Sequence, residues 1–385
     1  MKRVLYVCAS LLSLSALSVP LLMAADKDPE SNGKIYDLKA LSVTISEPVL
    51  LAKSKEGNWL CHPRLAWLAN GEIVATIWQG GGEGKQGFSF SRDQGATWSE
   101  PEFIARPPGY LSVRLPSGDF AFLGSTLSSK PGGMSGGYYL IPNGTREIKW
   151  LPEGVEITGL PRPAAVSKSN PGGAGFVLRG QTAKFREDLF LCTLYGRFAD
   201  TARDSLLLAE SANGLQWKIK SIITDAKDGM IPGMVEGANE SAIIRLKDGQ
   251  LLCIYRSGGP YGQVWSSDIG KSWPRPERAA CDGNVQPALA LLRDGSLALA
   301  TGRRLGLSFN LDGTGKAWQD VSIKDHHKGY HPEEKESAEE QPNGGTSGYP
   351  HLLPLDDMHL LYAYDRCLTT GTSVWIVRVD IVKRQ

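Results

Sequence analysis

Three residue types that could act together in chemistry stand far apart along the chain. Glu240 is followed by Arg256, and Tyr349 begins a later apolar segment. A phenol has an ordinary pKa of about 10 and becomes a nucleophile when a nearby carboxylate accepts its proton. Guanidinium groups bind carboxylates through paired, charge-assisted hydrogen bonds. The combination predicts covalent catalysis on an anionic substrate if the fold brings these residues into one cavity.

A repeat along the chain predicts how distant residues meet. Each copy has alternating apolar residues, a turn of the form Leu-x-(Asp/Asn/Ser)-Gly, and alternating residues again. Asp-Gly and Asn-Gly tolerate the positive φ of a tight turn, so each copy reads as a β-hairpin. The five turns are Leu68–Gly71, Leu115–Gly118, Leu246–Gly249, Leu292–Gly295 and the variant Leu355–Met358.

A second signature follows three of these turns and is known as an Asp box. Its intact copies are 91–98 and 266–273, and degenerate copies occupy 211–217 and 312–318. The Asp side chain binds its own backbone, the Gly takes positive φ, and the Trp packs beneath a neighbouring strand. We therefore interpret Asp93, Asp268 and Trp98 as structural and exclude them from catalysis.

The spacing of the two signatures suits four strands per repeat and six repeats in the mature chain. Such radial repetition predicts an all-β fold, a six-bladed β-propeller. Propellers bind ligands at the axial mouth, where the innermost strand of each blade contributes side chains. The innermost strands should begin each hairpin, which places Cys61–Leu68, Asn239–Leu246 and Tyr349–Leu355 at the centre.

These segments resemble the sialidase (exo-α-neuraminidase) superfamily, and the resemblance extends over most of the chain after its start. Glu240–Gly249, continuing to Arg256, resembles the segment that carries the family's catalytic Glu and second substrate Arg. Tyr349–Leu355, continuing to Tyr364-Asp365, resembles the segment of the nucleophilic Tyr, with Asp365 in place of a closing Glu. Arg303, before the last Asp box, resembles the third substrate Arg, although the adjacent Arg304 could be the residue that faces the pocket.

The resemblance implies Tyr349 as nucleophile, Glu240 as its base, and Arg256 with Arg303 as ligands of an acidic sugar. A sialoside carries a carboxylate on its anomeric carbon, which would repel an anionic nucleophile. A neutral Tyr suits such a substrate, and sialidases are known exceptions to glycosidases that use two carboxylates. The implied substrate is therefore an acidic glycan.

Two departures from the family pattern affect the site. Aligning the proline of the family's Arg-Ile-Pro motif on Pro63 puts Cys61 in the slot of the first substrate Arg. Arg64 is a substitute for substrate binding, but strand alternation turns it to the other face unless a bulge intervenes. The loop expected to carry the acid/base Asp, residues 79–86, has Glu83 as its only acid.

The start of the chain predicts export. Met1-Lys2-Arg3, an apolar run to Met23 and Ala24-Ala25 form a secretory signal, residues 1–25, which leaves a sialidase-like domain of residues 26–385. The protein is expected to be secreted or periplasmic, with no membrane contact after cleavage. A net charge of +1 argues against nucleic acid as a partner.

The remaining cysteines and histidines do not predict a metal site or a cofactor. Five cysteines after the signal lack metal-ligand spacing and could form at most two disulfides. The segment Asp325–His331 holds three histidines, but a charged, solvated loop is the simpler interpretation. We expect catalysis, if present, to use side chains alone.

Three functions fit these observations. The first is a secreted sialidase-like glycoside hydrolase that acts on acidic sugars through Tyr349 and Glu240. The second is a glycan-binding propeller without turnover, since the first Arg and the acid Asp of the family are missing. The third is another reaction on acidic polysaccharide, such as elimination by a Tyr and a His, which would need His62 or His351.

Overall fold

The computed structural model describes residues 33–55, 58–81, 83–165, 175–186, 188–227, 231, 235–281, 283–336 and 348–384. The chain divides into residues 1–31 and a compact unit, residues 32–385, and everything described belongs to the second. The predicted signal and its cleavage point near Ala25 lie outside the described residues. Within the described part, no helix is both long enough and apolar enough to span a membrane.

The unit consists almost entirely of short strands, as the alternating pattern predicts, and three of its sheets are four-stranded antiparallel arrays. These are β4 (Trp59–Trp67), β5 (Ile73–Gly80), β6 (Lys85–Ser91) and β7 (Glu102–Ile104); β18 (Asn239–Arg245), β19 (Leu251–Arg256), β20 (Gly262–Ser266) and β21 (Glu277–Arg278); and β22 (Ala288–Leu291), β23 (Leu297–Thr301), β24 (Gly306–Asn310) and β25 (Gln319–Ser322). A single helix among the described residues, α1 (Ile323–Tyr330), follows β25.

Two larger sheets complete the unit. The six-stranded sheet contains β1 (Lys34–Asp37), β2 (Leu41–Ile45), β3 (Val49–Lys53), β26 (Pro350–Pro354), β27 (His359–Leu368) and β28 (Gly371–Lys383). The ten-stranded sheet contains β8 (Gly109–Arg114), β9 (Phe120–Gly124), β10 (Ser128–Lys130), β11 (Gly133–Ile141), β12 (Lys149–Thr158), β13 (Phe176–Val177), β14 (Thr182–Arg186), β15 (Leu189–Gly196), β16 (Ser205–Ser211) and β17 (Gln216–Thr224).

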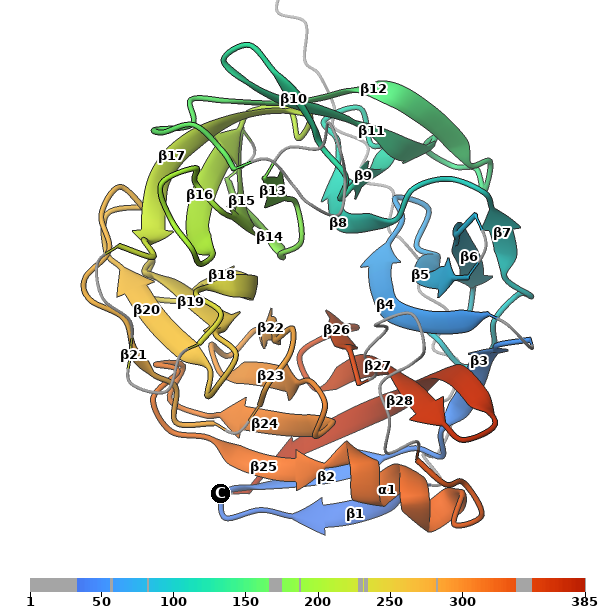
Figure 1. The fold of residues 1–385 in the computed structure, drawn as a ribbon. Coiled ribbons are helices and arrows are strands. Elements are labelled where there is room, and N and C mark those ends of the chain that lie inside the picture. The colour runs from blue at the N-terminus through green and yellow to red at the C-terminus, as the bar shows by residue number, and fades with distance from the viewer. Residues whose placement is uncertain are drawn as a thin grey trace, which may run out of the picture. The chain divides into compact units, whose positions relative to one another are not determined.

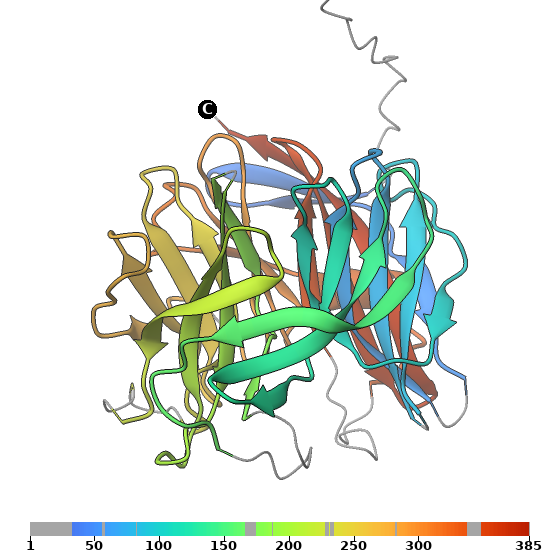
Figure 2. The same ribbon diagram turned by 90° about the horizontal axis from the view of Figure 1, so that it is seen from above.

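The sheets stand around a common centre, which gives a propeller-like arrangement (Figure 1). The strands β4, β8, β14, β18, β22 and β26 are innermost, and each contacts the next around the ring, with β26 contacting β4. Most strands stand upright beside one another when the view is turned by 90° (Figure 2). Because β28 pairs with β2, β3 and β27, strands from both ends of the unit share one sheet.

The sheet count differs from the predicted six separate blades. The described residues form five hydrogen-bonded sheets because β12 and β17 pair in parallel, Glu156 opposite Gln216 through Thr158 opposite Lys218. This short pairing joins the strands β8–β12 to the strands β13–β17. The sequence pattern does not reveal it, because it involves outer strands rather than the hairpins of the repeat.

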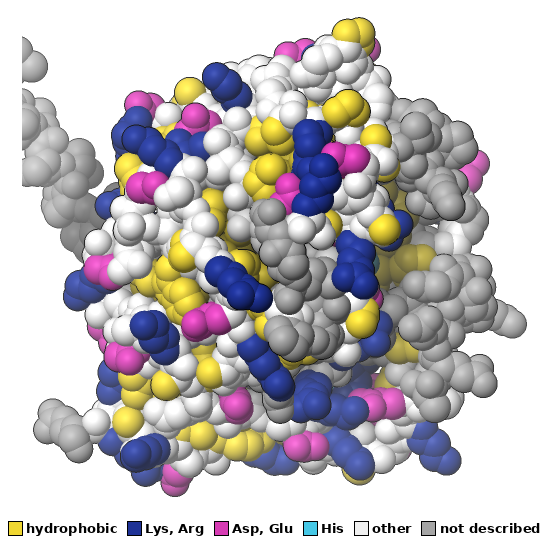
Figure 3. Space-filling model, turned by 60° about the vertical axis from the view of Figure 1, so that its left-hand side comes forward, with side chains coloured by type: hydrophobic (Ala, Val, Ile, Leu, Met, Phe, Trp, Pro, Cys, Tyr) yellow, Lys and Arg dark blue, Asp and Glu magenta, His cyan; other side chains and the backbone are white. Residues whose placement is uncertain are grey.

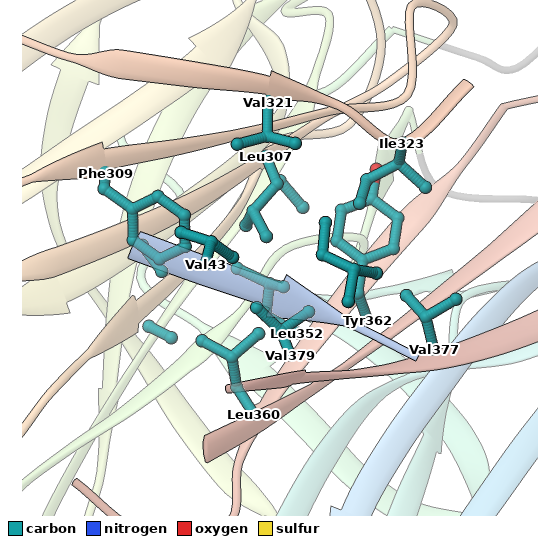
Figure 4. Packing of buried hydrophobic residues seen from close by; sticks show 14 of the residues in the cluster. Val43, Leu307, Phe309, Val321, Ile323, Leu352, Leu360, Tyr362, Val377 and Val379 are labelled. Atoms are coloured by element: carbon teal, nitrogen blue, oxygen red, sulfur yellow. The ribbon is translucent and has the colours of Figure 1, made fainter. Parts of the chain in front are cut away.

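Hydrophobic cores lie between the faces of neighbouring sheets. The largest one described joins the sheet of β22–β25 to the sheet of β26–β28, with β2 packed against both. Phe309 and Tyr362 are its bulkiest labelled members, and Val43, Leu307 and Val377 fill the space around them (Figure 4). Burial of apolar surface, the main favourable term in folding, thus fixes the angle between neighbouring sheets.

The turns of the second signature are closed by their own side chains. Asp93 Oδ1 accepts hydrogen bonds from Ser91 and from the backbone N–H of Thr97, and Asp268 makes the corresponding bonds to Ser266 and Ser272. Gly95 takes φ +91°, and Trp98 donates its indole N–H to the Gly95 carbonyl. These bonds hold peripheral hairpin turns, so both carboxylates are already used structurally.

The surface over β17–β21 carries Lys, Arg, Asp, Glu and hydrophobic side chains interspersed with one another (Figure 3). A near-neutral composition and a mixed face of this kind give no long-range attraction for an anion on this side. Recognition of a charged ligand would have to arise from groups inside the site.

Candidate active site

Tyr349 and Glu240 meet near the centre of the ring of inner strands. Tyr349 immediately precedes β26, and Glu240 is the second residue of β18. The Tyr349 hydroxyl donates to Glu240 Oε1 across 3.3 Å, although 109 residues separate them. The two residues are only 4% and 2% exposed. The structure therefore brings together a phenol and a carboxylate that can accept its proton.

Four donors surround the Glu240 carboxylate. Besides Tyr349, Arg179 Nη1 donates to Oε1 at 3.3 Å, and Arg256 Nη1 donates to Oε2 at 3.2 Å. The backbone N–H of Gln286 also reaches Oε2, at 3.2 Å. A buried carboxylate is tolerated when it is paired and hydrogen-bonded in this way, and its two oxygens are fixed in direction.

β-Bulges aim three of the site residues inward. The register of β18 with β19 shifts between Asn239 and Ser241, so Glu240 is the extra, unpaired residue. The register of β8 with β9 shifts around Tyr110 in the same manner. A bulged residue leaves the hydrogen-bonded ladder and points its side chain in a new direction, which is why bulges are frequent beside active sites.

A third bulge lies in β4, between Cys61 and Arg64, and it changes the expected facing of Arg64. His62, inside the bulge, has φ +55°. Arg64 is buried, and its Nε donates to the Tyr110 carbonyl at 3.4 Å. Burial is the main reason that the pKa of Arg64 falls to about 10, and the charges of Glu240 and Asp365 partly oppose this fall. The bulge anticipated as a condition for Arg64 is therefore present.

Arg179 is a central residue that sequence reasoning missed. It precedes β14, and its Nη2 donates to His62 Nε2 at 2.7 Å and to the Tyr110 hydroxyl at 3.2 Å. Its guanidinium lies 4.5 Å from the centroid of the Tyr110 ring. The hairpin of β14 and β15 lacks a Leu-x-x-Gly turn, so the repeat does not mark this inner strand. Only a less strict definition of the hairpin turn would have marked β14 as an inner strand and so pointed to Arg179.

His62 packs against the candidate nucleophile as a neutral imidazole. Its ring centroid lies 3.9 Å from that of Tyr349, with the planes at 64°. Because Arg179 can only donate, His62 Nε2 accepts, and the ring hydrogen is on Nδ1. Burial, with the charges of Arg179 and Arg64, lowers the pKa of His62 well below its usual value.

Asp365 ties the backbones of Tyr349 and His62 together. Its Oδ1 accepts from the backbone N–H groups of Gly348 and Tyr349 at 2.5 and 2.6 Å, and Oδ2 accepts from that of His62 at 3.2 Å. Burial raises the pKa of Asp365 to about 7, although these hydrogen bonds oppose the rise. The residue thus joins the start of β26 to the bulge in β4.

The other predicted residues lie at the margin of this cluster. Arg303 is exposed, has φ +62°, and donates its backbone N–H to the Gly348 carbonyl at 2.8 Å. Its side-chain charge helps to lower the pKa of Glu236. Glu83 is exposed in the turn between β5 and β6. Cys61 is buried, which raises its pKa, so it offers no substitute for a cation.

An axial cavity of about 210 Å³ lies beside the cluster. Tyr110 lines it together with Gln181 and His351. His351 Nδ1 accepts from the backbone N–H of Leu65 at 3.2 Å, and burial lowers the pKa of His351 well below its usual value. A larger cavity of about 620 Å³, lined by residues such as Trp265 and Asp312, is peripheral and shares no residue with the Tyr349 site. Among the described residues, no group of His, Cys, Asp or Glu is arranged to hold a metal ion.

Comparison with known proteins defines the fold. No protein-family model and no curated protein matches the chain. Its structure is similar to a protein of unknown function from Dyadobacter fermentans (TM-score 0.65, 18% identity, 88% of this chain and 99% of that chain). It is also similar to an α-L-arabinofuranosidase from Fusarium graminearum, in complex with an iminosugar inhibitor (TM-score 0.59, 14% identity, 88% of this chain and 97% of that chain). A further similar structure is the Trypanosoma rangeli sialidase in complex with sialic acid (TM-score 0.55, 15% identity, 87% of this chain and 58% of that chain).

These likenesses define the structural class of the chain. The chain has the fold of propeller-like glycoside hydrolases that include sialidases and an arabinofuranosidase. It spans little more than half of the trypanosomal sialidase but nearly all of the arabinofuranosidase. At such low identity the fold alone is shared, and the function rests on the geometry of the site.

Proposed function

We propose that this protein is a glycoside hydrolase in which Tyr349 attacks the anomeric carbon and Glu240 accepts the phenolic proton. The observation that carries the proposal is the hydrogen bond from the Tyr349 hydroxyl to Glu240 in a buried, arginine-bracketed site. As the bond from the Tyr349 oxygen to the anomeric carbon forms, the glycosidic bond breaks and the leaving alkoxide takes a proton from solvent water. Water then attacks the anomeric carbon of the glycosyl–tyrosine intermediate and loses a proton to solvent, and Glu240 returns its proton to the phenolate. The chemistry uses side chains and water alone.

A six-bladed propeller is the architecture that best accommodates this site. The six innermost strands contact one another in a closed ring. We propose that the ten-stranded sheet represents two blades, β8–β12 and β13–β17, which are joined by the β12–β17 pairing. We also propose that residues 1–25 direct export and are removed, which N-terminal sequencing of the protein from culture medium or periplasm would test.

A sialoside is the substrate that the sequence resemblance predicts. Arg64, Arg256 and Arg303 would then bind its carboxylate, and the charges of all three act on carboxyl groups in or beside the cluster. A neutral sugar would need no free guanidinium group. Whether the site accepts an acidic or a neutral sugar therefore depends on whether these arginines are available to a ligand.

Glycan binding without turnover is the second candidate function. The observation in its favour is the placement of Glu83, which is exposed and lies outside the cluster around Tyr349. Without a general acid, a sugar with a poor leaving group would bind and stay intact. Such a protein would hold its ligand and release no sugar from it, so detectable turnover would refute this function.

Elimination with His62 as base or acid is not supported by the hydrogen bonds. The lone pair of His62 Nε2 is used by Arg179, and the low pKa keeps the ring neutral. A ring in this state can neither accept a proton at Nε2 nor supply one from an imidazolium. His351 also accepts at Nδ1, from Leu65, and lines the axial cavity.

The hydrolase proposal is tested with the mature chain, residues 26–385, on a panel of 4-nitrophenyl glycosides of sialic acid, uronic acids, pentoses and neutral hexoses. We expect one class to be cleaved, and Tyr349→Phe to reduce kcat on it by at least about 100-fold, since a covalent route loses its nucleophile. Equal rates for the variant and the wild type would remove Tyr349 from the mechanism.

A further inference from the structure

The guanidinium fork of Arg256 is already filled by a carboxylate of the protein. Arg256 Nε donates to Glu236 Oε2 and Nη2 donates to Glu236 Oε1, both at 2.9 Å. The third nitrogen, Nη1, donates to Glu240. Two parallel N–H···O bonds are the geometry in which an arginine binds the carboxylate of a ligand. Glu236 therefore occupies the place that an acidic sugar would need.

Glu236 is held in this position by its backbone and by a second donor. Its N–H donates to the Ser257 carbonyl at 3.1 Å, and its own carbonyl accepts from the N–H of Asp204 at 3.1 Å. Oε2 also accepts from Asn239 Nδ2 at 3.2 Å. A side chain at Gly258 would lie 2.5 Å from Glu236 Cγ, so the packing here requires glycine. These restraints oppose any swing of Glu236 away from Arg256.

The charges around Glu236 also keep it ionised. Burial raises its pKa, but the hydrogen bonds from Arg256 and Asn239 and the charges of Arg256 and Arg303 outweigh that effect and lower it. Arg256 and Arg303, which the sialidase resemblance assigns to an acidic substrate, thus both act on Glu236. A substrate carboxylate arriving here would meet a fixed negative charge in place of a free cation.

We propose that Glu236 is a built-in substitute for a substrate carboxylate and that the site accepts an uncharged sugar. This inference rests on the proposed glycoside hydrolase function. The Glu236 side chain is 38% exposed, so oxygen lone pairs that are not used by Arg256 and Asn239 remain to accept hydrogen bonds from sugar hydroxyls. Discrimination against acidic sugars then follows from like-charge repulsion and from the occupied fork.

The test compares wild type with Glu236→Ala and the isosteric Glu236→Gln, and uses Glu102→Ala, at an exposed position of the outer strand β7, as control. The thermal midpoint is measured in sodium acetate and in sodium chloride at equal ionic strength, because a ligand that binds only the folded state raises it. Binding of N-acetylneuraminic acid and of L-arabinose is measured by calorimetry, and turnover is measured on the aryl glycoside panel.

We expect acetate to raise the thermal midpoint of Glu236→Ala but not that of wild type or Glu102→Ala. Glu236→Ala should bind N-acetylneuraminic acid about 10- to 100-fold more tightly than wild type, since one charge-assisted pair with Arg256 becomes available. Glu236→Gln, whose side chain has nearly the same volume as Glu, should gain part of this affinity. Wild type should cleave neutral glycosides in preference to sialosides.

The inference would be overturned if wild type cleaved sialosides while Glu236→Ala lost this activity and showed no acetate effect. The hydrolase proposal would then stand. If wild type cleaved no glycoside and Glu236→Ala gained carboxylate binding, the role of Glu236 would be supported. The hydrolase proposal would be refuted. The two proposals therefore fail in different ways.

Discussion

The Tyr349 hydroxyl and Glu240 Oε1 lie 3.3 Å apart, although Tyr349 directly precedes β26 and Glu240 belongs to β18, two inner strands that are separated in the ring by β22. The contact crosses the centre of the molecule and depends on the bulge that removes Glu240 from the β18–β19 ladder. Because both side chains are buried, neither can find an alternative partner in bulk water. The pair is therefore the structural basis of the proposed chemistry.

Replacing Glu240 with Gln tests the base. The amide keeps the volume and can accept a hydrogen bond from Tyr349, but it cannot take the phenolic proton. We expect kcat to fall by about 100- to 10,000-fold, the range for loss of a positioned base, with a smaller change in KM. Steady-state kinetics on the best aryl glycoside would measure this. Glu102→Gln, at an exposed position of the outer strand β7, should retain wild-type rates, and a similar loss in that control would point to a general effect on the fold.

Replacing Arg179 with Met tests the missed arginine. The variant leaves the buried Glu240 with one fewer cation and His62 without its donor. Removing one partner of a buried ion pair costs about 3 to 5 kcal/mol, so the free energy of unfolding should fall by an amount in this range. Urea denaturation would measure it. The exposed pair Arg186 with Asp188 offers a matched control, because Arg186→Met removes an ion pair at the surface and should cost less than about 1 kcal/mol.

The pKa of Asp365 predicts how stability depends on pH. Its folded value of about 7 is raised above the unfolded value, so the folded state binds the proton more tightly. The stabilisation of the folded state by the bound proton of Asp365 is largest at low pH. It is lost as the pH rises to about 7, and above that the free energy of unfolding no longer changes because of Asp365. Between pH 5 and pH 8 this amounts to about 2 to 3 kcal/mol less stability.

Asp365→Asn lacks this titration, so the difference in unfolding free energy between wild type and variant should change by that amount across the same pH range. Urea denaturation at pH 5, 6, 7 and 8 would show it. A difference that stays constant with pH would mean that Asp365 has an ordinary pKa, and the account of its burial would be wrong.

The protonation state of His62 gives a spectroscopic prediction. Long-range proton–nitrogen correlation spectra should show a neutral ring with hydrogen on Nδ1, and its shifts should not titrate between pH 5 and 8, because Arg179 uses Nε2 and burial depresses the pKa. His62→Gln serves to assign the signal. A titration midpoint near 6.5 for His62 would contradict the assigned hydrogen bond and would reopen elimination chemistry.

Much of the inner scaffold could be predicted from the sequence. The hairpin turns marked β4, β18 and β26 as inner strands, and the resemblance to sialidase segments in this region pointed to Glu240, Arg256 and Tyr349. Such local patterns survive in the fold because each hairpin forms from neighbouring residues. The all-β, propeller-like arrangement followed from their repetition, while the β12–β17 pairing depends on outer strands distant in sequence.

The rest of the site depends on bulges and on unmarked segments. Nothing in the local sequence shows that β4, β8 and β18 each carry a bulge, so the inward turn of Tyr110 and the burial of Arg64 were not predictable from alternation. Arg179 precedes a hairpin without the turn signature. Glu236 lies four residues before Glu240, where a period of two cannot tell that it folds back onto Arg256.

Trapping of the glycosyl–enzyme intermediate tests whether Tyr349 is the nucleophile. The mature chain would be treated with fluorinated glycosyl fluorides of the sugar class that it cleaves, then digested and analysed by tandem mass spectrometry. We predict that the mass of the sugar is found on the peptide that contains Tyr349, and that Tyr349→Phe is not labelled. Label on Glu236 or Glu240, with Tyr349 unmodified, would contradict the account.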